Sequence, residues 1–244
     1  MALSSFIRIA IIRVASIFFF SGRSKLIFYH DIHSNKKYTV MSTSIELFKK
    51  HINIIRENGF EIVNEITEPL GQIEICFDDA FLGLYDNIEL IKELNIPIHL
   101  FVISSYLEKE NHINKEQLLL LNKLSQIRIS SHTQTHQFLN IASESLLKNE
   151  LENSKNLLEG LLNISVDTIC YPEGKFNNTV VELAEGVGYN RQYSSLPGFY
   201  FNDFLPNVKR RSLVQFAGKK EFKAILKGGD HVLAFWYKFK DYNK

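Results

Sequence analysis

The sequence has few cysteines and no excess of charge of one sign. Cys76 and Cys170 are the two cysteines among 244 residues. They exclude a disulfide framework, and they lack the paired spacing of a zinc ribbon. The formal net charge is +1, so no global electrostatic attraction favours nucleic acid as a partner. We therefore expect two buried thiols in a reducing compartment and no nucleic-acid ligand.

The N-terminal segment is apolar but lacks an uninterrupted hydrophobic run. Arg8 and Arg13 break it, so no stretch approaches the roughly 20 apolar residues that span a bilayer. The charge-free apolar stretch at residues 14–20 is short for a signal peptide, and no clear cleavage site follows it. These features argue against a transmembrane helix and leave a signal anchor as the least favoured alternative.

A helix over this segment would have two unlike sides. One broad side carries Ser4, Ser5, Arg8, Arg13 and Ser16, and the other mostly carries Phe6, Ile9, Ile12, Ile17, Phe19 and Phe20. The pattern predicts peripheral contact with a membrane surface through residues 1–20. A helix packed on its own domain or on a partner explains the pattern equally well. The membrane alternative implies a cytoplasmic location, peripheral on the inner membrane face.

No internal repeat or low-complexity linker is visible after about residue 24. We expect an N-terminal amphipathic segment, residues 1–23, and one catalytic domain, residues 24–244. Strands are expected at residues 26–29, 60–63, 73–77, 98–103, 127–130, 168–170, 190–194 and 208–214. Helices are expected from a capping box at residues 43–46 to Gly59, and at residues 87–94, 114–124, 144–162, 179–187 and 221–226.

This alternation of strands and helices predicts a parallel sheet with helices outside it. The expected fold class is α/β, an irregular (β/α) barrel of about seven parallel strands with outer helices. An open, doubly wound sheet is the alternative. In both folds the chemistry belongs at the carboxyl ends of the strands, which gives a rule for judging the motifs.

Two adjacent carboxylates, Asp78 and Asp79, follow the apolar strand expected at residues 73–77. Like charges at a half-buried strand end are a poor structural choice, because each raises the cost of ionising the other. A metal ion resolves the conflict by taking one carboxylate as a ligand and leaving the other free. An Asp pair alone is weak evidence, since such pairs are common on surfaces.

Two histidines, His132 and His136, follow the strand expected at residues 127–130. If a helical turn begins there, a spacing of four puts both imidazoles on one face. That arrangement suits two nitrogen ligands of one divalent ion. No Glu follows His132, so this is not the His-Glu-x-x-His zinc motif. Taken alone, such a pair is more often structural.

Two further strand ends carry candidate groups. The strand at residues 168–170 leads into a loop with Pro172 and Gly174, which could aim backbone N–H groups at an oxyanion or form an ordinary turn. The strand at residues 26–29 delivers His30, a candidate general acid or a structural hydrogen-bonding group. Four strand ends with such residues at the same edge favour an active site over four coincidences.

The ordered motifs resemble the polysaccharide deacetylases, which are carbohydrate esterase family four with its NodB homology domain. Residues 76–80, Cys-Phe-Asp-Asp-Ala, resemble the motif Thr-Phe-Asp-Asp-Gly, residues 132–136, His-Thr-Gln-Thr-His, resemble the second motif, and residues 171–174, Tyr-Pro-Glu-Gly, resemble the Pro-x-Gly loop. Residues 29–31, Tyr-His-Asp, resemble the branch with an N-terminal Tyr-His motif. The resemblance covers roughly residues 26–215.

The resemblance implies a metal centre and a base. Asp79, His132 and His136 would bind one divalent metal ion, usually zinc in this family although other divalent ions occur. Asp78 would be the base that takes a proton from water activated by that metal.

The resemblance also implies an oxyanion donor and an acid. The backbone N–H of Glu173 would help to hold the tetrahedral oxyanion. In the branch with an N-terminal Tyr-His motif, that His protonates the leaving amine, so we assign the acid to His30. His231 near the C-terminus is the less favoured competitor.

The sequence departs from the family pattern at three positions. Ala80 replaces Gly and Cys76 replaces Thr. Cys170 stands where most members carry an Arg that restrains the base. We expect Arg211, in the strand at residues 208–214 and next to Arg210, to take over that task.

The expected function is hydrolysis of an N-acetyl group from an acylated amino sugar in surface-glycan or lipid-linked glycan assembly. One alternative is an O-deacetylase or an amidase acting on a non-sugar amide. Another is a non-catalytic glycan-binding relative, which is disfavoured because base, ligands and acid are all present. The expected partner is an acetylated amino sugar or glycan.

Overall fold

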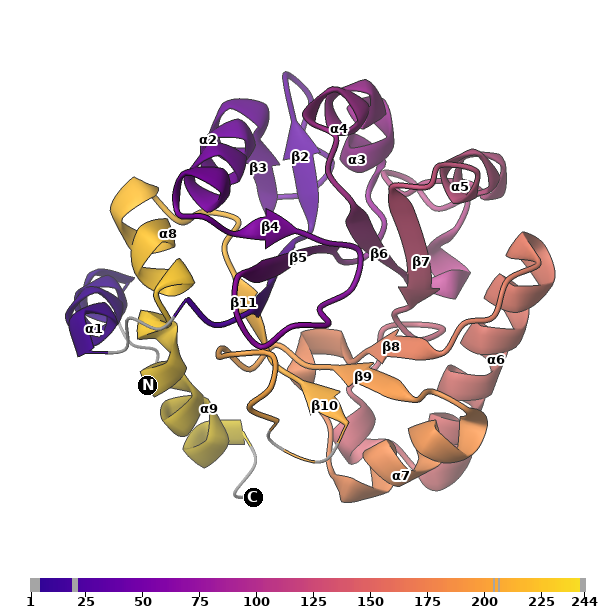
Figure 1. Ribbon diagram of the computed structural model, residues 1–244. Helices are drawn as coiled ribbons and strands as arrows, with labels where there is room; N and C mark the ends of the chain where they lie inside the picture. The colour runs from indigo at the N-terminus through magenta and orange to yellow at the C-terminus, as the bar shows by residue number, and fades with distance from the viewer. Residues whose placement is uncertain (1–4, 19–21, 204, 206, 242–244) are drawn as a thin grey trace.

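A ring of parallel strands with helices outside it forms the body of the protein in the computed structural model (Figure 1). The structure describes residues 5–18, 22–203, 205 and 207–241. The strands of the ring are β1 (Lys25–Tyr29), β5 (Gln72–Phe77), β6 (Ile98–Val102), β7 (Ile127–Ser131), β8 (Thr168–Cys170), β9 (Arg191–Tyr193), β10 (Val208–Lys209) and β11 (Arg211–Leu213). Each pairs in parallel with its neighbours.

The ring closes through a strand that is divided in two. The strand expected at residues 208–214 is β10 and β11, separated by Arg210. Its first half pairs with β9 and its second half with β1, so one segment bridges both sides of the opening. Counting that segment once, the described residues give seven positions around the ring. This confirms the predicted barrel, and the alternative of an open sheet is wrong.

The outer helices lie close to their predicted places. They are α2 (Ile45–Glu57), α3 (Leu82–Asp86), α4 (Ile88–Leu94), α5 (Lys115–Asn122), α6 (Glu144–Leu162), α7 (Asn178–Val187) and α8 (Lys219–Leu226). Of these helices, α3 was not predicted. The capping box of α5, Asn114 with Gln117, is confirmed. The one predicted for α2 at Thr43 is wrong: the N-cap is Ser44. Thr43 lies in the short strand β3 (Ser42–Ser44), which pairs with β2 (Asp31–His33), and its hydroxyl donates to the Gln215 carbonyl at 2.8 Å.

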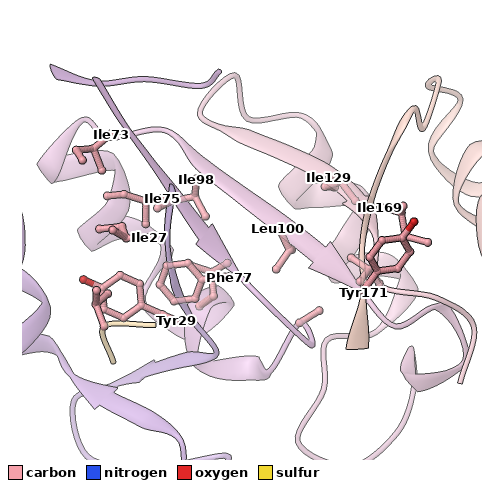
Figure 2. Packing of buried hydrophobic residues seen from close by; sticks show 14 of the residues in the cluster. Ile27, Tyr29, Ile73, Ile75, Phe77, Ile98, Leu100, Ile129, Ile169 and Tyr171 are labelled. Carbon is pink, nitrogen blue, oxygen red and sulfur yellow. The ribbon is translucent and has the colours of Figure 1, made fainter. Parts of the chain in front are cut away.

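Alternation along the strands produces two buried layers. In β5, Ile73, Ile75 and Phe77 belong to the large cluster between strands and helices, whereas Cys76 belongs to a smaller cluster. Figure 2 shows residues of the large cluster side by side on successive strands. Strands buried on both faces are typical of parallel sheets. The side that faces the ring interior also carries the polar residues that converge at the strand ends.

The N-terminal helix, α1 (Ser5–Phe18), packs against α8 and the 3₁₀ turn η4 (Gly229–Val232), which leads into α9 (Leu233–Asp241). Ile12 is fully buried, and Arg8 donates to Glu221 at 2.5 Å. One face of the predicted amphipathic helix therefore packs on its own domain. Ser4, Phe19 and Phe20 lie outside the described residues.

The sequence patterns did not predict the C-terminal helix α9.

The domain boundary after residue 23 stays a prediction. Among the described residues, no helix is long and apolar enough to cross a membrane.

Candidate metal centre

The predicted site residues gather where the strands of the barrel end. Asp78 and Asp79 follow β5 directly, His30 follows β1, and His132 follows β7. Register brings these ends together: Tyr29 pairs with Phe77, and the residue pairs continue through β6 to Ser131. Because neighbouring parallel strands end at one edge, the polar residues that follow them line the same opening of the barrel, here called the mouth.

Three donor groups converge on one point in this mouth. The Nε2 atoms of His132 and His136 lie 3.4 and 3.6 Å from Oδ1 of Asp79. These three ligand atoms lie within 4.8 Å of one another. Oδ1 of Asp79 is buried and has no hydrogen-bond partner, a state that costs free energy unless a cation or water satisfies it. Two nitrogens and one carboxylate oxygen are a ligand set that suits zinc, so the residues fit a divalent ion.

The imidazole of His132 is oriented by the backbone. Its Nδ1 lies 2.8 Å from the carbonyl oxygen of Cys170. Since a carbonyl only accepts, Nδ1 carries the hydrogen and Nε2 presents its lone pair toward Asp79. A backbone acceptor behind a ligating imidazole is a common support in metal sites.

The helical turn expected between the two histidines is not present. Thr133 and His136 have positive φ values of 67° and 63°, so a loop with two left-handed residues brings the imidazoles together. The hydroxyl of Thr133 accepts from the His136 N–H at 3.1 Å. The Thr135 N–H donates to Glu150 of α6 at 2.7 Å. These bonds to hydroxyl and carboxylate groups replace the helical hydrogen bonds.

The lowered pKa values of Asp79 and His136 favour a cation between the donors. Burial raises the pKa of Asp79, but the neighbouring His132 outweighs burial and lowers that pKa to about 2. Burial and the neighbouring His132 lower the pKa of His136 to about 4, which keeps its nitrogen available as a ligand. Burial also lowers the pKa of His132, but Cys170 and the Asp79 carboxylate raise it above its ordinary value.

Asp78 faces a different partner. Nη1 and Nη2 of Arg211 donate to its two carboxylate oxygens at 2.7 Å each. Nε of Arg211 donates to the Ser194 carbonyl at 3.0 Å, and the guanidinium lies over the ring of Phe28. Burial raises the pKa of Asp78, but the adjacent guanidinium outweighs burial and holds that pKa below its ordinary value.

Cys170 lies beside this ion pair. Its Sγ accepts from Nη2 of Arg211 at 2.7 Å and lies 3.9 Å from Oδ2 of Asp78. Arg211 therefore reaches Asp78 from β11, which is separated from β5 by β1 alone, and its guanidinium takes the place expected for one on β8. Arg210, its neighbour in the chain, instead lies near Gly198 and His231.

His30 lies at the rim of the same mouth. Its charge acts on Asp78 and Asp79, and its Nδ1 lies 2.6 Å from Oε1 of Gln215. Sequence reasoning missed Gln215, because no motif marks it. Gln215 also lines a cleft of about 290 Å³ that extends past Ser195 to Arg8 and Tyr237.

His231 lies elsewhere in the fold. It belongs to η4 and stacks on Phe199 with ring centroids 5.4 Å apart. Its charged neighbours are Arg210, Lys25 and Asp230, and Lys25 is the first residue of β1, at the opposite end of that strand from His30.

The loop after β8 is strained. Glu173 has φ 51° and Gly174 has φ 65°, two consecutive left-handed residues. A Cβ on Gly174 would meet the backbone nitrogen of Ser195 at 2.8 Å, so only glycine fits there. The loop lies beside the mouth, as predicted. The role of the Glu173 N–H as an oxyanion donor stays a prediction.

A second polar cluster, unpredicted, fills the ring interior. Nδ1 of His99 lies 2.7 Å from Oε1 of Glu74, and its Nε2 lies 2.7 Å from Oγ of Ser130. The Tyr193 hydroxyl also donates to Glu74, and burial raises the pKa of that carboxyl to about 7. Glu74, Cys76 and His99 could also be grouped as ligands, but the carboxylate and imidazole already have partners, unlike Asp79.

Comparison with known proteins supports the fold and the motif pattern. Residues 66–191, a little over half of the chain, match the family model described as Polysaccharide deacetylase. The Bacillus subtilis protein YxkH, whose name assigns it to polysaccharide deacetylases, is 25% identical over 184 residues. The match covers 71% of this chain and 64% of YxkH, so the chain spans less than two thirds of that relative.

Two solved structures are similar in fold. The Streptococcus pyogenes deacetylase PplD, solved in complex with acetate, has a TM-score of 0.71 and 19% identity, covering 82% of this chain and 96% of that one. A de-N-acetylase from Aggregatibacter actinomycetemcomitans has a TM-score of 0.73 and 18% identity, covering 83% of this chain and 99% of that one. At such low identity, the likeness shows a shared fold.

Proposed function

The chain belongs to the polysaccharide deacetylase family, and from that premise we propose that it is a metal-dependent hydrolase that removes N-acetyl groups from an acylated amino sugar. The observation that carries the proposal is the pairing of two unlike carboxylates in one mouth. Asp79 faces two imidazoles with an unsatisfied oxygen, and Asp78 faces Arg211.

Asp79, His132 and His136 would hold one divalent ion, with zinc as the proposed metal. A divalent ion bound there would supply Lewis-acid chemistry, polarising the acetyl carbonyl and lowering the pKa of water. Two nitrogens and one oxygen from the chain leave room for substrate and water, as in catalytic zinc sites.

The side chains around this centre divide the proton transfers. Asp78 takes a proton from the attacking water, and Arg211 keeps that carboxylate ionised and aimed. The water oxygen bonds to the acetyl carbon, and the carbonyl oxygen becomes an oxyanion beside the Glu173 N–H. His30 gives a proton to the nitrogen as the C–N bond breaks, and Gln215 fixes its ring. The products are acetate and a free amine.

The proposed substrates are acetylated amino sugars of surface-glycan or lipid-linked glycan assembly, at the cytoplasmic face of the membrane. Acetate, which PplD binds in its solved structure, is the acid that this reaction would release. The cleft that leads away from Gln215 provides room for further sugar units or a carrier. An O-deacetylase or a non-sugar amidase would use the same groups, and only the substrate separates these alternatives.

The test compares acetate release and bound metal in matched variants. Purified wild type, Asp79→Asn, Asp78→Asn and the exposed control Asp86→Asn are screened against acetylated sugars that are free, nucleotide-linked and lipid-linked. Asp79→Asn should lose both metal and activity. Asp78→Asn should keep the metal and lose activity by at least about 100-fold. Asp86→Asn should match the wild type.

Three outcomes would overturn the proposal. Acetate release by Asp78→Asn at the wild-type rate would exclude Asp78 as the base. A metal-replete wild type that holds far less than one metal ion per chain would favour the non-catalytic glycan-binding alternative. Release from O-acetyl esters or non-sugar amides, but not from N-acetyl sugars, would select one of the other hydrolases.

A further inference from the structure

The outward face of α1 is apolar, which is the reverse of an ordinary surface helix. Phe6, Ile17 and Phe18 are 81%, 74% and 79% exposed, and Ile7 and Val14 are more than half exposed. Surface helices of globular proteins normally turn polar residues to solvent and apolar residues to the core. Exposed apolar residues gathered on one helix face mark a surface that another apolar medium covers.

The polar residues of α1 serve to hold the helix in this orientation. Arg8 pairs with Glu221, which is 6% exposed, and Ser16 is buried. Ile12 is fully buried, and Gly229 of η4 leaves no room for a side chain against the α1 backbone. Arg8 and Ser16 lie opposite Phe6 and Ile17, as the sequence predicts, but Ile12 packs on the domain and not on the side of Phe6 and Ile17. The opposite face of α1 packs on the domain, and this packing holds the apolar face toward solvent.

Apolar residues continue from α1 onto the neighbouring elements. Ile11, Val14 and Phe18 share a wholly apolar groove with Val232 of η4. On α9, Phe235 is 80% exposed and Trp236 is 43% exposed. Trp, whose apolar ring carries one polar N–H, is enriched where membrane and water meet, and Phe235 adds exposed apolar surface beside it.

The charges beside this surface are all of one sign. Arg13 and Ile17 share an open groove with Lys220, Lys223 and Lys227 of α8. Across residues 6–18 and 219–232, the acidic side chains are Glu221 and Asp230. Both are buried and paired, with Arg8 and Lys25, so they do not offset the charges of Arg13 and Lys220, which are exposed.

We propose that the outward face of α1, with the α8 lysines and the α9 aromatics, docks on the surface of an anionic lipid bilayer. The apolar side chains would enter the boundary between headgroups and acyl chains, and the lysines would meet lipid phosphates. A bilayer fits better than a protein partner, because a cationic row beside an apolar strip matches anionic headgroups over hydrocarbon. With its inner face packed on the domain, α1 lies flat on the membrane.

A cleft connects the docking helix α1 with the residues around the catalytic mouth. Arg8 of α1 and Gln215, the partner of His30, line the same cleft. A substrate held at the lipid surface would therefore have a path to the site. The docking proposal itself stands on α1, α8 and α9 and does not depend on the proposed reaction.

The test is flotation of the full chain with phosphatidylcholine vesicles, with and without phosphatidylglycerol, at low and high salt. Ile17→Ser removes one exposed apolar side chain, and Ile141→Ser, 77% exposed and distant from α1, is its matched control. Lys220→Glu with Lys223→Glu reverses the basic row, and Lys115→Glu with Lys148→Glu is the control on α5 and α6. Thermal unfolding without vesicles checks that every variant is folded.

Wild type should float only with phosphatidylglycerol vesicles, and less at high salt. The α8 lysine variant should bind at least about ten-fold more weakly and Ile17→Ser several-fold more weakly, whereas both controls should match wild type. Failure of wild type to float, or equal losses in test and control variants, would overturn the proposal. So would light scattering that shows a dimer dissociated by Ile17→Ser, because the second copy would then cover this face.

Discussion

Asp78 and Asp79 are neighbours in the chain, yet their surroundings make them different chemical groups. The first is held by two donors of Arg211, and the second has an oxygen without a hydrogen-bond partner between two imidazoles. Two adjacent ionised carboxylates normally oppose each other's ionisation. Here each faces its own cation or cation site, so both stay ionised and can serve separate steps.

We expect Arg211→Gln to move the acidic limb of the pH–rate profile to higher pH. The proposed base works ionised, and the guanidinium outweighs burial to keep the pKa of Asp78 low. Without it, burial raises that pKa, so the ionised fraction falls at a higher pH. The measurement is kcat/KM for acetate release against pH.

The same variant should also be destabilised by roughly 3–5 kcal/mol, because it leaves Asp78 buried without its charge partner. Arg211→Lys is the control, since it keeps the charge and loses the paired geometry. Its limb should lie between those of wild type and Arg211→Gln. An unshifted limb in a folded Arg211→Gln protein would contradict the positioning role.

His30 and His231 can be separated by the leaving group. We expect His30→Gln to slow acetate release from an N-acetyl sugar by about 100-fold or more, because an amine leaves only when protonated. Release from 4-nitrophenyl acetate, whose leaving group needs no acid, should change little. His231→Gln should leave both reactions unchanged, and the reverse pattern would assign the acid to His231.

Motif residues could be predicted because each follows an apolar run directly, and strand ends converge in a parallel barrel. Their supports could not be predicted in this way. Gln215 is 185 positions from His30 along the chain, and no short spacing relates them. The predicted pairing of Arg211 with the base site rested on the missing Arg at position 170, and the structure places its guanidinium against Asp78.

At the scale of elements, boundaries were predictable where a local rule decides them. The helix α6 and the strand β8 begin and end where capping and apolar runs place them. The helical turn considered for residues 132–136 is absent. The conformation of this segment depends on bonds to Ser131 and to Glu150 of α6. A spacing of four fits a helix or a folded loop equally well, and only those contacts decide between them.

His51 on α2 joins three elements as a neutral imidazole. Its Nε2 donates to the carbonyl of Ala217 at 2.7 Å, so its Nδ1 accepts from the Tyr29 hydroxyl at 2.8 Å. Its ring stacks on Phe222 of α8, with centroids 3.9 Å apart. Burial lowers the pKa of His51 to about 4. A proton on Nδ1 would remove the bond from Tyr29.

This lowered pKa predicts a stability that falls in acid. Between an unfolded pKa of about 6.5 and the folded value, the unfolded chain binds a proton that the folded chain does not, so stability rises with pH there. We expect the unfolding free energy to fall by about 3 kcal/mol as pH falls through this window, because His51 is protonated there in the unfolded chain but not in the folded chain. Urea unfolding of His51→Gln should show a correspondingly flatter pH dependence, and equal slopes in both proteins would contradict it.

At the scale of the whole molecule, the barrel follows from the alternation of strands and helices, and the sequence predicted it. The division of the last strand did not follow, because its first half, β10, pairs with the preceding strand β9, whereas its second half, β11, pairs with β1 near the other end of the chain. The orientation of α1 did not follow either. Its pattern shows two unlike faces, but which face meets the domain depends on Glu221 and Gly229, more than 200 residues later.

That orientation can be tested with two identical residues on one helix. Ile12 is fully buried against the rest of the chain, whereas Ile17 is 74% exposed. We expect Ile12→Ala to lower the unfolding free energy by about 2–4 kcal/mol, because it opens a cavity between α1 and η4. Ile17→Ala should change it by less than about 0.5 kcal/mol. Urea unfolding of both variants without lipid measures the difference. Equal losses would mean that α1 packs by another face, and the surface assigned to the membrane would then be part of the core.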